Sequence, residues 1–208
     1  MSRAIVIFAR APEVEAAVKG LPARFAGLFH RTTAAWLRAA TFCDATPVIA
    51  CEAHARARFD AILPDVGRLY VDQRGATFGE RLASSAEAAF ALGFDEVLIT
   101  GIDVPVAHAT DVFAALSRAR AVVQPARDGG INLIGLRAPE RELLSAIQPR
   151  QRDVLQRCRA YFDSLVVLEV SSDLDLFAVD RLPLAEVPMA VVDLRPHRSH
   201  TIRPPPAG

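Results

Sequence analysis

A carboxylate that follows a buried strand is the first candidate for chemistry in this sequence. Val97–Thr100 carries no charge and is rich in β-branched side chains, which predicts a buried strand. Gly101, Asp103 and a turn closed by Pro105 follow it. Ligands of open α/β sheets bind beyond the carboxyl ends of strands, so Asp103 stands where a carboxylate can hold a metal or a ribose hydroxyl. Capping of the next helix is the alternative role, because aspartate is a favoured cap and turn residue.

Two further acidic turns widen the choice of metal ligands. Asp128-Gly129-Gly130 and Asp173-Leu174-Asp175 both lie near the ends of expected strands. A Mg²⁺ site for phosphate chemistry uses one or two carboxylates, and the substrate phosphates supply other ligands. The sequence has no glycine-rich dinucleotide fingerprint, P-loop, nucleophile elbow or H-E-x-x-H motif. Metal-assisted phosphate chemistry is therefore favoured over a covalent nucleophile.

Strand-like and helix-like segments alternate along the chain. This alternation predicts an α/β fold of three layers (α/β/α), with a mostly parallel, Rossmann-like sheet covered by helices on both faces. The expected strands are Ile5–Ala9, Pro47–Cys51, Leu69–Val71, Val97–Thr100, Ala121–Gln124, Ile131–Leu136 and Val166–Val170. The expected helices are Arg24–Cys43, Ala53–Ile62, Phe78–Leu92, Thr110–Ala119, Glu140–Ile147 and Arg152–Phe162. The segment from Arg10 to Ala23 is expected to be a long connection, since it contains Pro12, Gly20 and Pro22.

Length and composition narrow the class of protein. The 208 residues favour one domain over residues 1–182, followed by a Pro-rich tail at 183–208. Within that tail, Met189–Leu194 is a candidate edge strand or contact in a homodimer. The formal charge is balanced and no apolar run reaches membrane-spanning length, which argues against a nucleic-acid binder and a membrane span. Three cysteines without metal-type spacing, and an N-terminus unlike a signal peptide, predict a cytoplasmic protein.

Five short motifs occur in a characteristic order. They are Phe8-Ala9-Arg10-Ala11-Pro12, Phe78-Gly79-Glu80-Arg81-Leu82, Thr100-Gly101-Ile102-Asp103-Val104-Pro105, Pro125-Ala126-Arg127-Asp128-Gly129-Gly130-Ile131-Asn132-Leu133-Ile134-Gly135-Leu136 and Asp173-Leu174-Asp175. Together they resemble an uncharacterised bacterial family of glycosyltransferase-A-like proteins, related to 2-phospholactate guanylyltransferase and the molybdenum-cofactor guanylyltransferases. The resemblance covers roughly residues 3 to 182. It implies the nucleotide-diphospho-sugar transferase (GT-A) fold.

The resemblance also implies roles for particular residues. Asp103 and Asp175 would hold a divalent metal, Mg²⁺ or Mn²⁺, against phosphates, with Asp103 and Lys19 carrying the catalysis. The nucleotide would be bound by residues of the first loop and of the G-E-R segment, with Arg24 as an alternative phosphate partner: Arg10, Lys19, Arg24, Gly79, Glu80 and Arg81. The acceptor side would be lined by the D-G-G turn and its neighbour: Asp128, Gly129, Gly130 and Asn132. A Cβ at Gly130 is expected to crowd a close backbone approach.

The first loop departs from the family pattern, which usually reads F-A-K-A-P-x-P-G-x-x-K-T-R-L. Here Glu13 and Glu15 have entered the loop, and each would disfavour a nearby phosphate by about a kcal/mol. Two functions are therefore carried forward. One is a Mg²⁺-dependent transferase that moves a nucleotidyl or glycosyl group from a nucleoside triphosphate or nucleotide sugar to a small acceptor. The alternative is a catalytically degenerate protein of the same fold that acts as a binding or assembly subunit.

Overall fold

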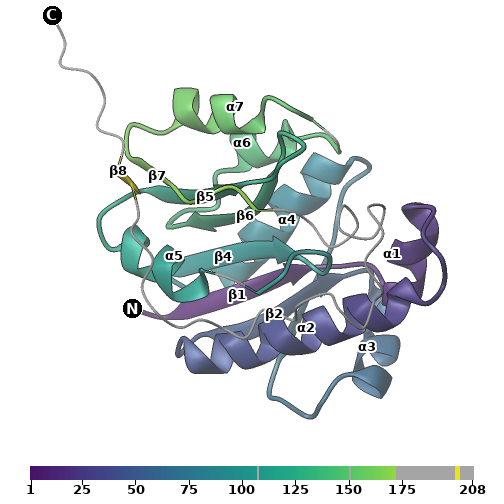
Figure 1. Ribbon diagram of the computed structural model, residues 1–208. Helices are drawn as coiled ribbons and strands as arrows, with labels where there is room; N and C mark the ends of the chain where they lie inside the picture. Colours follow the sequence, from purple (N-terminus) through teal and green to yellow (C-terminus); the bar gives the residue numbers. More distant parts are fainter. Residues whose placement is uncertain (107, 150, 172–199, 202–208) are drawn as a thin grey trace, which may run out of the picture.

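A single eight-stranded sheet runs through the protein, in the order β3-β2-β1-β4-β6-β5-β7-β8 (Figure 1). The structure is a computed structural model, and it describes residues 1–106, 108–149, 151–171 and 200–201. The strands are β1 (Arg3–Phe8), β2 (Thr46–Cys51), β3 (Leu69–Asp72), β4 (Glu96–Gly101), β5 (Ala121–Pro125), β6 (Ile131–Leu136), β7 (Leu165–Val167) and β8 (His200–Thr201). Strands β1 to β4 are parallel to one another, whereas β6 is antiparallel to both β4 and β5.

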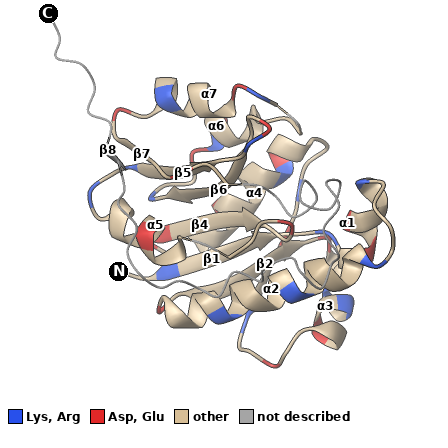
Figure 2. Cartoon of the chain, viewed as in Figure 1, with Lys and Arg blue, Asp and Glu red and all other residues tan. Residues whose placement is uncertain are grey.

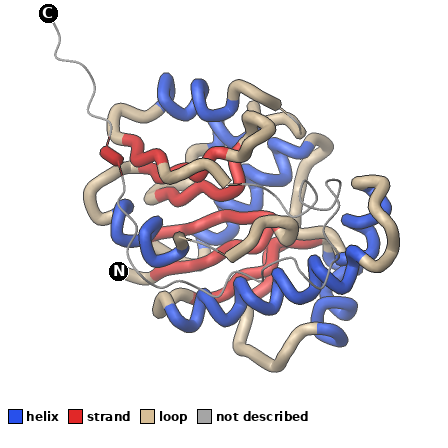
Figure 3. Tube along the Cα trace, viewed as in Figure 1, coloured by secondary structure: helices blue, strands red, loops and turns tan. Residues whose placement is uncertain are grey.

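Helices cover both faces of this sheet (Figure 3). They are α1 (Pro12–Val18), α2 (Phe25–Phe42), α3 (Arg56–Ile62), α4 (Phe78–Ala91), α5 (Ala109–Leu116), α6 (Arg141–Ser145) and α7 (Val154–Tyr161), with a 3₁₀ turn at Ala53–Ala55. One core cluster joins the sheet to α2, α3 and α5, and a second joins its other face to α4, α6 and α7. The predicted three-layer α/β class is confirmed. No helix among the described residues is both long and apolar enough to cross a membrane.

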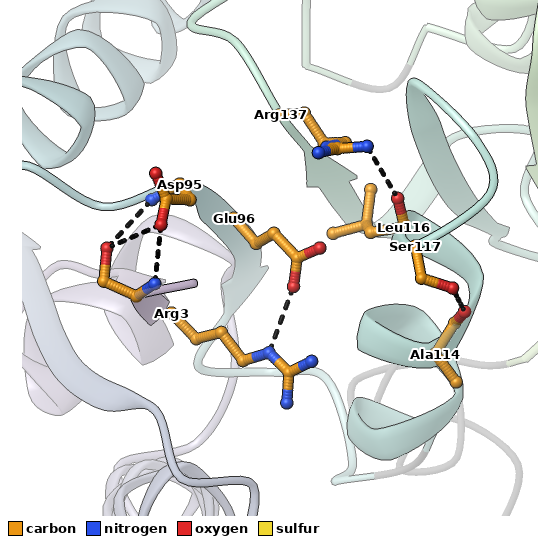
Figure 4. Close-up of polar contacts among 8 residues, drawn as sticks. Arg3, Asp95, Glu96, Ala114, Leu116, Ser117 and Arg137 are labelled. Atoms are coloured by element: carbon orange, nitrogen blue, oxygen red, sulfur yellow. Dashed lines mark hydrogen bonds and ion pairs between the residues drawn. The ribbon is translucent and has the colours of Figure 1, made fainter.

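The central strands are apolar on both sides because both faces of the sheet are covered. Ile5 and Ile7 enter one core cluster, while Val6 enters the other. At the amino-terminal edge the buried Glu96 accepts a hydrogen bond from Arg3 Nε at 3.0 Å (Figure 4). Arg3 and Glu96 are register partners, so this ion pair fixes the alignment of β1 and β4.

The segment after β1 differs from the expected long connection, because it contains α1. Pro12 is the first residue of that helix, where its missing N–H costs nothing. Gly20 adopts a positive φ of 68° just beyond the helix end. There its N–H donates to Ala17 O at 3.0 Å, and the Leu21 N–H donates to Ala16 O at 2.8 Å. This is the Schellman arrangement that ends many helices. Two residues interpreted as loop signals are thus the start and stop signals of a short helix.

The C-terminal tail contributes one described strand. Residues of β8 pair antiparallel with β7, as Thr201 with Val166 and His200 with Val167. The expected edge strand at Met189–Leu194 lies outside the described residues.

Candidate functional site

The carboxyl ends of β1 and β4 meet at the switch point of the sheet. The chain leaves β1 toward β2 on one side, while β4 pairs with β1 on the other side. Phe8 and Gly101, the last residues of the two strands, are register partners. Such a switch point is the general ligand-binding place of open α/β sheets. Arg10 and Asp103 follow directly from these two strand ends.

Lys19 and Asp103, which lie 84 positions apart in the sequence, form an ion pair at this edge. Lys19 is the C-cap of α1, and the Gly20 turn that follows it fixes where the lysine side chain begins. Both side chains are largely buried, at 22% and 17% exposed. Asp103 does not cap the next helix, since α5 begins at Ala109 with His108 as its N-cap. Capping of the next helix, the alternative role considered for Asp103, is therefore wrong.

Glu15 links Arg10 to the Lys19–Asp103 ion pair. Its carboxylate contacts Arg10 Nη1 through Oε2 at 3.0 Å and lies 3.8 Å from Lys19 Nζ through Oε1. The four side chains form a row of alternating charge, Arg10–Glu15–Lys19–Asp103, here called the charged row. Acidic and basic positions accordingly lie close together along α1 and its flanking segments (Figure 2). The sequence singled out Glu15 only as a repulsive residue, and its bridging role was missed.

Two polar side chains that sequence reasoning did not select hold the strand ends in place. Trp36 of α2 is fully buried, and its indole N–H donates to Val104 O at 2.8 Å, next to Asp103. The Gln73 amide donates to Ala9 O at 3.1 Å and to Ala50 O at 2.8 Å, so it joins the ends of β1 and β2. In the sequence, a lone tryptophan in an apolar helix indicates only packing. A glutamine directly after a strand, in contrast, is a recognisable candidate for a polar contact at the strand end.

The residues present fit a metal only in part. Among the described residues, no group of three or more His, Cys, Asp or Glu side chains is arranged to hold a metal ion. Asp175, the second expected ligand, lies outside the described residues. Asp103 alone fits a divalent ion whose other ligands come largely from phosphates and water, which is the usual mode for Mg²⁺.

The G-E-R segment opens α4 through a capping box. Thr77 Oγ1 accepts from the Glu80 N–H at 3.2 Å, and the Glu80 carboxylate accepts from the N–H groups of Thr77 at 3.0 Å and Ala76 at 2.7 Å. These backbone donors, with Thr77 the largest contributor, hold the pKa of the Glu80 carboxyl below its usual value. Gly79 is buried beside α6, where a Cβ would meet the carbonyl oxygens of Ser145 and Ile147. These contacts give Glu80 and Gly79 a structural role at the helix start, and their expected contact with a nucleotide stays a prediction.

Arg24 and Arg81 are not tied to the charged row by any contact found in the described part of the chain. Arg24 is exposed and its guanidinium lies 5.8 Å from the Phe25 ring centroid. The Arg81 carbonyl accepts from the hydroxyls of Ser84 and Ser85, which are side-chain-to-backbone contacts inside α4. Their expected contact with a nucleotide stays a prediction.

The D-G-G turn joins β5 to β6 at the same sheet edge as Asp103, because β5 runs in the same direction as β4. Asp128 Oδ1 accepts from the Gly130 N–H at 3.0 Å, which closes the turn locally. The crowded position is Gly129 and not Gly130 as expected, since Gly129 has a φ of 95° and a Cβ there would lie 2.8 Å from Arg152 O. Asn132 is buried and donates to Ser171 Oγ at 2.6 Å.

Comparison with solved structures supports the fold. The chain matches a protein of Desulfovibrio desulfuricans described as a nucleotide-diphospho-sugar transferase, with 24% identity, a TM-score of 0.69, and coverage of 84% of this chain and 83% of that one. It matches Rv0371c of Mycobacterium tuberculosis, solved with manganese, at 14% identity and a TM-score of 0.52, over 84% and 91% of the two chains. It also matches the 4-diphosphocytidyl-2C-methyl-D-erythritol synthase of Anaerococcus prevotii at 16% identity and a TM-score of 0.51, over 81% and 86%.

These likenesses establish a nucleotide-diphospho-sugar transferase type of fold. No curated protein sequence gives a significant match. A family described as "Uncharacterized protein conserved in bacteria (DUF2064)" matches residues 34–149, which is more than half of the chain and includes α4, Asp103 and the D-G-G turn. The chain therefore belongs to the DUF2064 family.

Proposed function

We propose that this chain is a transferase that binds a nucleoside triphosphate or a nucleotide sugar at the carboxyl edge of β1 and β4. It would move a nucleotidyl or glycosyl group to a small acceptor with the help of a divalent metal. The observation that carries the proposal is the meeting of Lys19 with Asp103 at the switch point of the sheet. The fold shared with a nucleotide-diphospho-sugar transferase supports the same kind of activity.

Each residue of the site has a role that follows from its charge and place. Arg10 and Lys19 would neutralise the phosphate groups, including the charge that develops on the leaving phosphate. Asp103 would be a metal ligand, and a divalent metal there supplies further neutralisation of phosphate charge. The D-G-G turn on the neighbouring β5–β6 hairpin would face the acceptor. Rate enhancement would then come from positioning and electrostatics without a covalent intermediate.

A thermal-shift panel of nucleoside triphosphates and nucleotide sugars, each with Mg²⁺, with Mn²⁺ and with a chelator, tests this proposal. Because a ligand stabilises the native state by mass action, a ligand at about a hundredfold excess over its Kd should raise the melting temperature by roughly 5 °C or more. Mn²⁺ belongs in the panel because Rv0371c was solved with manganese.

Asp103→Asn should remove the metal-dependent part of the shift, since an amide is a poorer ligand for a hard cation than a carboxylate. Asp65→Asn is the matched control, because Asp65 is an exposed carboxylate in the loop between α3 and β3. If no nucleotide shifts the wild-type protein at millimolar concentration, the transferase proposal is rejected.

A second candidate function is a binding or assembly subunit that has kept the fold without the reaction. The observation that favours it is the engagement of Arg10 and Lys19 by Glu15, a carboxylate of their own chain. The same panel separates the two functions, because only the transferase requires a nucleotide that binds together with a metal.

A further inference from the structure

The Glu15 carboxylate lies between the two cations proposed to bind phosphate. One oxygen contacts Arg10 at 3.0 Å and the other lies 3.8 Å from Lys19. The side chain is only 13% exposed, so water screens these contacts weakly. Guanidinium and ammonium groups bind carboxylates and phosphates through the same charge-assisted hydrogen bonds. Glu15 therefore holds the two cations in the way that an anionic ligand would.

The charges of the row balance one another. Arg10 and Lys19 are positive, while Glu15 and Asp103 are negative. A phosphate entering this site cannot simply add to two unpaired cations, and it must take the place of a carboxylate that already contacts them. The loss of those contacts subtracts directly from its binding free energy.

We propose that Glu15 is an autoinhibitory anion, which occupies the phosphate-binding cations of the site and is displaced when a phosphate ligand binds. The proposal rests on the proposed function in placing phosphate at Arg10 and Lys19. The displacement of Glu15 raises the concentration that a phosphate ligand needs in order to bind. A ligand with several phosphate charges overcomes this competitor, whereas a single phosphate gains less from the exchange.

Glu13 shows that this arrangement is a property of Glu15 and not of the helix. Both glutamates lie in the first turn of α1, where either one complements the helix dipole. Glu13 is exposed and instead contacts Arg58 Nε at 2.6 Å, away from the charged row. Glu13→Gln is thus a matched control for Glu15→Gln, with the same change of charge on the same helix.

The test is isothermal titration of inorganic tripolyphosphate into wild-type protein and the variants, in the presence of a chelator. Tripolyphosphate carries neither base nor sugar, so the titration does not depend on which nucleotide the protein prefers. Glu15→Gln should bind it about tenfold more tightly than wild type, because the internal competitor has lost its charge. Glu13→Gln should stay within about threefold of wild type, as expected for an exposed, screened charge.

Lys19→Met provides the internal check on mechanism. If Glu15 acts through the cations, the tighter binding caused by Glu15→Gln should be smaller in the Lys19→Met background, where Arg10 is the one cation of the row that Glu15 still contacts. Equal or weaker binding by Glu15→Gln in the wild-type background would overturn the proposal, because Glu15 would then orient the cations and not occupy them. A Glu15→Gln protein that fails to fold would also overturn it, by assigning Glu15 a structural role.

These outcomes are separable from those of the proposed function. Tighter tripolyphosphate binding by Glu15→Gln with no nucleotide shift in the panel would support the inference and reject the transferase. Nucleotide-dependent shifts in the panel, together with unchanged tripolyphosphate binding by Glu15→Gln, would support the transferase and reject the autoinhibitory role of Glu15.

Discussion

Gly79 is a position where the fold leaves no space for a side chain. It lies in the first turn of α4, against the backbone at the end of α6. A Cβ there would come within 2.6 Å of Ile147 O and closer still to Ser145 O. Backbone carbonyls cannot move aside as the tip of a side chain can, so any side chain forces the two helices apart.

Gly79→Ala is therefore expected to lower the free energy of unfolding by about 2 to 3 kcal/mol, through overpacking. Gly27→Ala is the matched helical control, because its Cβ would meet only Arg31 Nη1 at an ordinary 3.7 Å. That control should gain about 0.5 to 1 kcal/mol from helix propensity. Urea denaturation measures both, and equal stabilities for the two variants would contradict the packing argument.

The sequence identified Asp103 and Lys19 separately, but only the fold shows that they meet. Asp103 was recognisable because it follows a buried strand, which is a local pattern. The partners of Glu15 are local, with Arg10 five positions before it and Lys19 four positions after it. They were missed because this segment was expected to be a long connection, and the i,i+4 pair with Lys19 follows only once α1 is a helix. A glutamate near expected phosphates was interpreted as repulsive, when its charge is balanced by Arg10 and Lys19.

Among the helices that the structure describes, α4 is the one that begins with a side-chain cap. Its capping box occupies Thr77 and Glu80 together. The pKa of the folded Glu80 carboxyl lies below the ordinary value of 4.5 because backbone N–H groups favour its charged form. A lowered folded pKa gives stability that is fully present above the unfolded pKa and is lost as the pH falls through the folded pKa.

Glu80→Ala should consequently lower the melting temperature by a few degrees at pH 7, and the difference from wild type should shrink below about pH 4. Melting curves at pH 7, 5 and 3 measure this dependence. Glu87→Ala on the same helix is the control, because Glu87 contacts the exposed Arg141 on the surface at 2.5 Å. A Glu80→Ala deficit that stays constant with pH would show that the carboxylate charge has no part in the cap.

Local patterns were sufficient to place most elements within one to three residues. The strand expected at Val97–Thr100 extends over Glu96–Gly101, and the helix expected at Arg24–Cys43 is Phe25–Phe42. The exceptions are β8, for which no strand was expected at His200–Thr201, and α1. Pro12 and Gly20 are equally good signals for a loop and for a helix with capped ends. The seven residues of α1 are too few to show an apolar period that would decide between the two.

The amino-terminal edge of the sheet holds contacts that stabilise the fold, whereas the carboxyl edge holds the candidate site. Arg3 and Glu96 lie at the amino-terminal edge (Figure 4). Ser2 lies there too, and its N–H donates to Asp95 Oδ2 at 2.7 Å. Five residue steps along β1 place this edge about 17 Å from the carboxyl edge. Contacts at the first edge should thus affect stability without affecting ligand binding at the second.

Arg3→Met is expected to lower the free energy of unfolding by about 2 to 3 kcal/mol, because it leaves the Glu96 carboxylate buried without its partner. Arg157→Met is the matched control: Arg157 contacts Asp153 at the same 3.0 Å, but both side chains are 48% exposed. That surface pair should contribute less than about 1 kcal/mol. Urea denaturation gives both values, and a tripolyphosphate affinity altered by Arg3→Met would contradict the separation of the two edges.

The order of the strands could not be predicted from the sequence. Alternation predicted a mostly parallel sheet, and the two strands around the D-G-G turn were found, but not the insertion of β6 between β4 and β5. Pairing of β6 with β4 joins residues about 35 positions apart, and such contacts depend on the whole packed sheet. This insertion carries the D-G-G turn to the edge where Asp103 lies.

The hydrogen bond from Trp36 to Val104 has a practical consequence. Trp36 is the single tryptophan of the chain, and its indole is bonded to the residue that follows Asp103. Indole emission responds to the polarity and hydrogen bonding of its surroundings. Trp36 is therefore a built-in fluorophore that contacts the loop carrying Asp103. Movement of that loop can be followed by the intrinsic tryptophan fluorescence of the unlabelled protein.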